Sequence, residues 1–241
     1  MVRVNRRRVR AIFRKELVEY RHNGFIIWTM AIFPLIFLIQ PLVVVFALPA
    51  SASAELSHEH LLLYMLGIPA IVPAAVAAYA VVGERQQGTL EPVLTTPVRR
   101  QEFLLGKALA ALVPSVTVAY AVYAVFLVCV GLFARPAVAS SLLRAPDLLA
   151  QLLFTPLLAG WSIWVGIAIS ARASDFRVAQ QLGILASLPT AVVAALLAFD
   201  VLHPTLGVAL GLAAALLAGN GLGWRVTAAA FDRERLITRT N

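Results

Sequence analysis

Six long stretches of the sequence contain no Asp, Glu, Lys or Arg, and they constrain the fold more than any other feature. They cover residues 22–54, 60–83, 108–134, 148–171, 178–199 and 201–224. Each exceeds the about 20 residues that a helix needs to cross about 30 Å of hydrocarbon. Because the bilayer interior cannot hydrogen-bond a bare backbone, such runs must be helical. The sequence therefore predicts an all-α, polytopic membrane protein with six transmembrane helices.

Composition agrees with a membrane domain, since 61% of the residues are hydrophobic and 13% are charged, against about 25% charged residues in soluble domains. We expect a cytosolic amphipathic helix over residues 1–23, a membrane domain over 24–224 and a cytosolic tail over 225–241. The expected spans are about 24–48, 61–83, 108–133, 148–170, 178–199 and 205–224, with a linker at 84–107. The net charge of +8 does not indicate nucleic-acid binding, because the basic residues lie in blocks between spans, where they attract anionic lipid headgroups.

The basic blocks predict the orientation of the chain. The N-terminal segment to residue 23, the 84–107 linker, the 172–177 turn and the segment from residue 225 hold 18 of the 20 Lys and Arg residues. Lys and Arg accumulate in cytosolic connections, so both termini are predicted to be cytosolic. The first apolar run is longer than the about 7–15 residues of a signal peptide, which favours an anchor over a cleaved leader. The excess of Arg over Lys is typical of a GC-rich genome and indicates a bacterial plasma membrane.

Two helices carry a further pattern. Ahead of the first span, Val9, Ile12, Phe13, Leu17 and Tyr20 share one helical face and basic residues occupy the other. This arrangement favours a helix on the membrane surface over a merely topology-setting basic tail. In the sixth span, small residues recur at steps of four and predict a helix-packing stripe rather than a transport path. They are Gly207, Gly211, Ala215, Gly219 and Gly223.

The linker between the second and third spans is more elaborate than topology requires. Residues 83–107 read GERQQGTLEPVLTTPVRRQEFLLGK. Leu90, Val93 and Leu94 would share the apolar face of a short helix. After a turn, Thr96 as N-cap and Pro97 in the first position would open a second helix that continues into the third span. A loop that only sets topology needs positive charge but not this helix, turn and helix pattern.

The linker resembles that of type-2 ABC transporter permeases, which carry a Gly-Thr-Leu-Glu core, a Thr-Pro turn and a Glu followed by Gly-Lys. These motifs stand here as residues 88–91, Thr96 with Pro97, Glu102, and Gly106 with Lys107. The resemblance extends to Lys15, Glu16 and Leu17, to SARASDFRVAQQ at 170–181 and to FDRER at 231–235. It covers the whole chain in the order and number of spans.

The resemblance implies the permease subunit of an ATP-driven exporter. Such a subunit pairs with a second permease protomer, identical or different, and with two cytosolic ABC ATPase subunits that bind ATP and Mg. The linker helix of the family docks on the ATPase. Carried over to this chain, the docking positions are Glu84, Gln87, Gly88, Thr89, Leu90 and Glu91.

No cofactor, metal or catalytic activity is expected of this chain itself. Gln101 and Ala108 replace residues that a GxxxxGK[ST] phosphate loop needs around Gly106 and Lys107. The His58, Glu59 and His60 cluster lacks the HExxH spacing of a zinc site, and no GxSxG occurs.

The interiors of the predicted spans contain no ionisable residue. A secondary transporter, or a channel-like protein not coupled to ATP, stays the alternative, although ion-coupled carriers usually mark their path with such residues. The expected cargo is a hydrophobic or amphipathic compound, drug-like or lipid-like. Aromatic residues of the spans are candidates to line its path, with lipid anchoring as the alternative. They are Trp28, Tyr79, Tyr120, Tyr123 and Trp161.

Overall fold

The computed structural model describes residues 5–47, 60–88, 98–203 and 205–230, and these residues form ten helices and no strand. The bounds are α1 Arg6–His22, α2 Gly24–Ala47, α4 Leu61–Tyr64, α5 Gly67–Ala77, α6 Tyr79–Gln86, α8 Arg100–Phe133, α9 Pro136–Leu142, α10 Ala145–Ser170, α11 Phe176–Ala198 and α12 Leu206–Ala230. Six helical segments are long and apolar enough to cross a membrane. The all-α prediction with six membrane spans is therefore confirmed.

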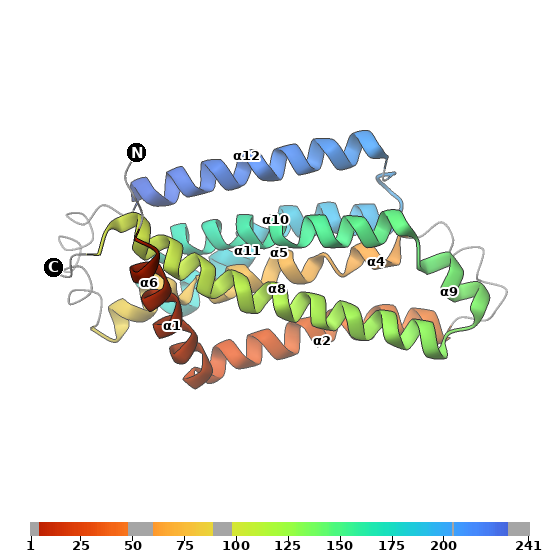
Figure 1. Ribbon diagram of the computed structural model, residues 1–241, viewed down its shortest axis with the longest axis horizontal. Helices are drawn as coiled ribbons and strands as arrows, with labels where there is room; N and C mark the ends of the chain where they lie inside the picture. Colours follow the sequence, from red (N-terminus) through yellow and green to blue (C-terminus); the bar gives the residue numbers. More distant parts are fainter. Residues whose placement is uncertain (1–4, 48–59, 89–97, 204, 231–241) are drawn as a thin grey trace.

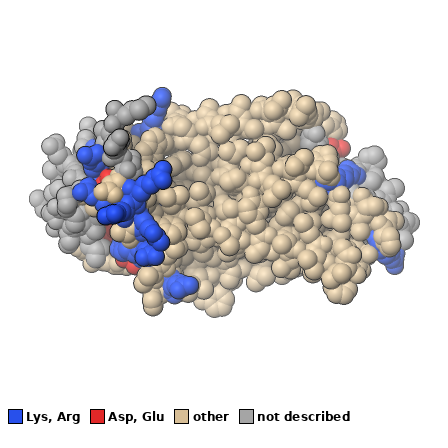
Figure 2. All heavy atoms as spheres, viewed as in Figure 1, with Lys and Arg blue, Asp and Glu red and all other residues tan. Residues whose placement is uncertain are grey.

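The helices form an elongated bundle (Figure 1). Helix α1 crosses one end of it, where α6 ends and α8 begins, while α9 lies at the other end. The C-terminal end of α12 lies at the same end as α1. Lys and Arg gather at this end, and the middle of the visible face carries neither acidic nor basic residues (Figure 2). We call the end of the bundle where α1 lies the charged end.

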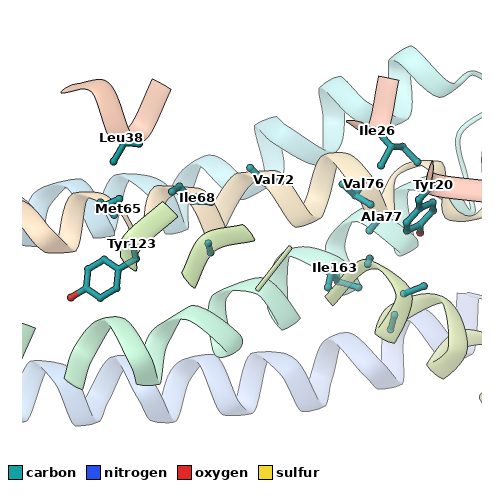
Figure 3. Close-up of a cluster of buried hydrophobic side chains, with 14 of the residues drawn as sticks. Tyr20, Ile26, Leu38, Met65, Ile68, Val72, Val76, Ala77, Tyr123 and Ile163 are labelled. Atoms are coloured by element: carbon teal, nitrogen blue, oxygen red, sulfur yellow. The ribbon is translucent and has the colours of Figure 1, made fainter. Parts of the chain in front are cut away.

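The second span forms the centre of the bundle. In an apolar stretch of 18 residues of this span, 89% of the residues are buried, compared with 22% in α2 and 0% in α12. Figure 3 shows Met65, Ile68, Val72 and Val76 of this span near Leu38 of α2 and Ile163 of α10. The surrounding helices keep large apolar side chains exposed, as lipid-facing surfaces require.

The central span is not one continuous helix. It is divided into α4, α5 and α6, and the break between α5 and α6 is bridged by Ser170 of α10. The Ser170 hydroxyl donates to the carbonyl of Ala78 at 2.6 Å and accepts from the backbone N–H groups of Val81 and Val82 at 3.0 Å. Backbone groups without water must find such partners inside a membrane. The break is thus a built feature of the contact with α10.

Close approach of α10 to the central span depends on Gly166. A Cβ atom at this position would lie 2.7 Å from the carbonyl oxygen of Ala74 in α5. Ser162, one turn earlier, donates to the carbonyl of Ala70 at 2.6 Å. The two helices therefore pack backbone to backbone, as small residues allow in membranes.

Helix α8 corrects one predicted boundary. It begins at Arg100 with Arg99 as its N-cap, so the helix does not run on from Pro97 as predicted; Thr96 and Pro97 themselves lie outside the described residues. The reason is Glu102, whose carboxylate accepts from the backbone N–H of Arg99 at 3.0 Å and satisfies a donor at the start of the helix. At 34 residues, α8 is about 51 Å long, so its first turns extend past a bilayer core of about 30 Å.

The small residues of α12 fall into two groups. A Cβ atom at Gly219 would lie 3.1 Å from the ring of Trp161, and one at Gly223 would lie 2.8 Å from Cβ of Trp164. A Cβ atom added at Gly207 or Gly211 would have no atom of another helix within 4 Å among the described residues. Among the described residues, the glycines of the stripe that contact α10 are the two nearer the charged end, Gly219 and Gly223.

Candidate functional site

Three helices meet at the charged end, and each contributes charged side chains to one buried cluster. Lys107 of α8 places its Nζ 2.8 Å from Oε1 of Glu16 in α1 and 3.0 Å from Oε1 of Glu84 in α6. The side chains of Lys107 and Glu16 are 1% exposed and that of Glu84 is 3% exposed. Together with Lys15, these residues are named the ion cluster. It joins parts of the chain that are up to 91 residues apart.

Lys15 completes the ion cluster at its outer edge. Its Nζ lies 2.8 Å from Glu84, 2.8 Å from Glu19 and 3.2 Å from Glu16. Burial lowers the pKa of Lys15, but the charge of Glu16 and the hydrogen bonds to Glu19 and Glu84 raise it further, so the pKa lies above its ordinary value. Lys15 is therefore protonated at neutral pH and neutralises part of the carboxylate charge.

Tyr20 of α1 lies in the packed interior near Ile26 and Ala77 (Figure 3). It is close enough to the ion cluster to feel the charges of Glu16 and Glu84. Its hydroxyl has no hydrogen-bond partner within the described residues. Burial, followed by the charge of Glu16, raises the pKa of Tyr20 well above its ordinary value. The side chain therefore stays a neutral phenol beside the carboxylates.

Helix α1 is held against α8 at two further points. A Cβ atom at Gly106 would lie 2.6 Å from Cγ2 of Ile12, so only glycine permits this crossing. Nearer the start of α1, the Glu102 carboxylate accepts from the backbone N–H of Asn5 at 2.8 Å and pairs with Arg8 at 3.3 Å. The motif residues Glu102, Gly106 and Lys107 thus all contact α1.

Neighbouring helix ends are tied to the same region. Arg85 of α6 donates to the backbone carbonyls of Ala173 at 2.7 Å and Ala171 at 3.3 Å, in the turn between α10 and α11. Arg100 of α8 donates to the carbonyl of Ala228 in α12 at 2.8 Å. A displacement of α6 would therefore act directly on α1, α8 and the turn that follows α10.

The predicted docking residues divide into three groups. Glu84 lies buried in the ion cluster rather than on the surface. Gln87 and Gly88 are exposed where α6 ends, and Gly88 takes the left-handed backbone conformation with a φ of 69°. Thr89, Leu90 and Glu91 lie outside the described residues. The linker helix over Leu90, Val93 and Leu94 therefore stays a prediction.

The sequence patterns predicted no role for Lys15, Glu16 or Lys107, although all three belong to the motifs that resemble the permease family. The available signal was their charge. An acidic residue and two lysines next to apolar spans need partners once the helices pack, because isolated buried charges are strongly unfavourable. Their pairing across three helices could not be read from spacing along the chain.

The aromatic candidates for a substrate path have different surroundings. Trp28 of α2 is 64% exposed. Tyr79 packs edge-on against Phe176, with the ring centroids 5.4 Å apart. Tyr120 of α8 donates to the carbonyl of Leu152 at 2.8 Å, whereas Tyr123 is buried. Trp161 packs against Gly219 of α12. These residues stay candidates, and no common surface links them in the contacts described.

Polar groups are also buried at the end opposite the charged end. Asp147 lies within the first turn of α10, is 5% exposed and is 2.9 Å from Nδ1 of His60. The predicted fourth span began one residue later and so left this carboxylate out. One turn further, the side-chain amide of Gln151 is buried without a hydrogen-bond partner among the described residues. Across all of the described residues, no group of three or more His, Cys, Asp or Glu side chains could hold a metal ion.

A family model described as ABC-2 type transporter matches residues 7–220. The matched region includes all of the ion cluster and most of the six spans. No curated protein matches the chain.

Proposed function

The chain belongs to the ABC-2 type transporter family, and from this premise we propose that it is the permease subunit of an ATP-driven exporter in a bacterial plasma membrane. It supplies half of a translocation path, and a second permease protomer supplies the other half. Separate cytosolic ATPase subunits bind ATP with Mg and dock on the linker. The charged end then faces the cytosol, in agreement with the positive-inside distribution of Lys and Arg.

The observation that carries this proposal is the position of the ion cluster. Glu84, held by Lys107 at 3.0 Å and by Lys15 at 2.8 Å, lies only a few residues before the proposed docking helix. A force applied to the linker reaches α6 first and passes through these ion pairs to α1 and α8. Where packed helices have two discrete arrangements, such ion pairs can convert a small local shift into the movement of a whole helix.

The expected cargo is a hydrophobic or amphipathic compound. The described spans offer no free charge for an ionic substrate in their middle, and their large exposed side chains are apolar. A proton-coupled or ion-coupled secondary transporter is the second candidate. The buried pair of Asp147 and His60 favours it, since buried ionisable groups in membrane helices often take part in ion coupling.

The test is Leu90→Asp in the linker. If Leu90 enters an apolar groove of the ATPase, the new carboxylate loses hydration without gaining a partner, at a cost of several kcal/mol. Co-purification of the ATPase and substrate-stimulated ATP hydrolysis in reconstituted vesicles should both collapse. Glu91→Ala should weaken them less, because loss of a charged hydrogen bond costs about 1.5–3 kcal/mol.

Gln86→Asp is the matched control, because Gln86 is exposed at the end of α6 and is not among the proposed docking positions. It adds the same negative charge within the linker but outside the apolar face of Leu90, Val93 and Leu94, so it should leave association and hydrolysis intact. Normal association with correctly inserted Leu90→Asp protein would refute the docking role. Transport that persists without any ATPase would favour the secondary transporter.

A further inference from the structure

An apolar cavity of about 330 Å³ lies between α11 and α12, with α10 as its floor. Its walls include Ala186, Pro189 and Val193 of α11, Ala215 of α12 and Leu158 of α10. Both α11 and α12 pack on α10, and α12 contacts it through Gly219 and Asn220. The cavity lies among membrane spans, away from the ion cluster, and is not used by the proposed coupling mechanism.

The chemistry of the walls selects an uncharged, apolar ligand. No charged residue lines the cavity. Its one hydroxyl group, on Thr190, already donates to the backbone carbonyl of Ser187 at 2.7 Å. An occupant therefore needs neither a charge nor a hydrogen-bonding group, and it gains contacts with side chains that would otherwise face a void.

The dimensions select one class of apolar ligand. Along α11 the walls run from Ala186, in the middle of the helix, to Leu197 at its end. This is about 16 Å at 1.5 Å per residue, close to half of a hydrocarbon core of about 30 Å. Even all of the empty space of the cavity, about 950 Å³ including the part open to the surroundings, gives a mean cross-section of only about 60 Å² over that length. A helix with side chains, about 10–12 Å in diameter, needs about 80–110 Å². The space suits an extended hydrocarbon chain, not a helix of a second protomer.

We propose that this cavity binds one acyl chain of a membrane lipid, drawn from the leaflet remote from the charged end. The chain fills the space between α11 and α12 and fixes α12 to the rest of the bundle. Its methyl end lies near Trp161 and Gly219, at the deep end of the cavity. A transported hydrophobic compound shares the same chemistry, so the experiment must separate the two sources.

The experiment uses the purified full chain in phosphatidylcholine vesicles whose acyl chains carry bromine atoms, which quench tryptophan fluorescence on contact. The signal of Trp161 is the difference between the native chain and Trp161→Phe. Bromines near the methyl end should quench Trp161 more strongly than bromines near the headgroup. Ala215→Phe and, independently, Ala186→Phe fill the cavity and should reduce this quenching by about twofold or more.

Ala214→Phe is the matched control, because Ala214 is exposed on α12 and does not line the cavity. It should leave the quenching of Trp161 unchanged. The proposal is wrong if the two filling variants quench like the native chain, or if Ala214→Phe lowers quenching as much as they do. It is also wrong if a lipophilic dye, added at micromolar concentration to the same vesicles, abolishes the difference between filled and native cavities. None of these outcomes depends on the ATPase, so failure here is distinguishable from failure of the proposed function.

Discussion

Lys107 determines the electrostatics of the charged end at the level of single residues. It is the buried cation that faces both Glu16 and Glu84. Bringing such groups out of water costs several kcal/mol for each ion, and their mutual attraction repays this only when all partners are present. The cluster is therefore weak as a source of stability but sensitive to the loss of one member. That sensitivity suits a contact that must respond to a small displacement.

Lys107→Met tests this sensitivity. The variant keeps the approximate shape of the side chain but removes the buried cation that pairs with Glu16 and Glu84. Only the partly exposed Lys15 of the ion cluster then offsets the two carboxylates, so the free energy of unfolding should fall by about 3–5 kcal/mol. Unfolding by SDS in mixed micelles measures the change. Lys15→Met is the comparison, because Lys15 is 39% exposed and water can replace it, so its loss should cost less. Adding Glu84→Gln to Lys107→Met should restore part of the stability. Equal losses for the two lysines would argue against a buried, strongly coupled cluster.

Gln151 and Tyr123 show a different residue-scale feature. Their polar atoms are buried near Asp147 without hydrogen-bond partners among the described residues. A buried polar group that lacks a partner costs about 1–3 kcal/mol. Such a cost is tolerated where the group serves a purpose, for example holding an internal water or meeting a substrate. Gln151 therefore joins Tyr123 and the other aromatic candidates as a position to examine for transport.

At the level of elements, the contact of α1 with α8 carries the coupling proposal, and Gly106 controls it. Gly106→Val would place Cβ 2.6 Å from Ile12 and push the two helices apart. Overpacking of this kind costs about 1–3 kcal/mol. ATP hydrolysis should become uncoupled from transport even while the ATPase stays bound. Arg10 of α1 and Leu109 of α8 line one pocket between the two helices, and spin labels at these positions should report a longer distance.

Gly131→Val provides the control for Gly106→Val. It makes the same change in the same helix, but nothing lies within 4 Å of a Cβ atom there among the described residues. Distance and coupling should both stay native. If Gly106→Val also left the spin-label distance and the coupling unchanged, α1 would not be a transmitting element.

The sequence predicted the elements well where the signal was local and poorly where it was not. Uncharged runs predicted six spans, and six helical segments are long and apolar enough to cross a membrane, because exclusion of charge from hydrocarbon acts on each helix separately. The division of the second span was missed, because the break at Ala78 is stabilised by Ser170, 92 residues away. The start of α8 at Arg100 was not predicted, because it is stabilised by contacts of Glu102 with Arg99 and with Asn5, which is 97 residues away along the chain.

At the scale of the whole molecule, the two ends of the bundle differ in kind. One end carries most of the basic side chains (Figure 2) and also the ion cluster. The pair of His60 and Asp147 lies at the other end, where α4 and α10 begin. The termini of the described chain, at α1 and the end of α12, lie together at the charged end (Figure 1). An even number of spans requires this placement, so the fold is consistent with the orientation predicted from Lys and Arg.

The orientation itself is tested by cysteine labelling in intact cells, in a chain whose single cysteine is removed by Cys129→Ala. Ser57→Cys lies in a connection of low positive charge, and Ser140→Cys is exposed in α9 at the end remote from the ion cluster. Both should react with a membrane-impermeant maleimide, because Lys and Arg hold the opposite end in the cytosol. Gln86→Cys, exposed at the charged end, should react only after the membrane is permeabilised. Labelling of Gln86→Cys in intact cells, with protection of the other two, would invert the topology and remove the linker from the reach of any cytosolic ATPase.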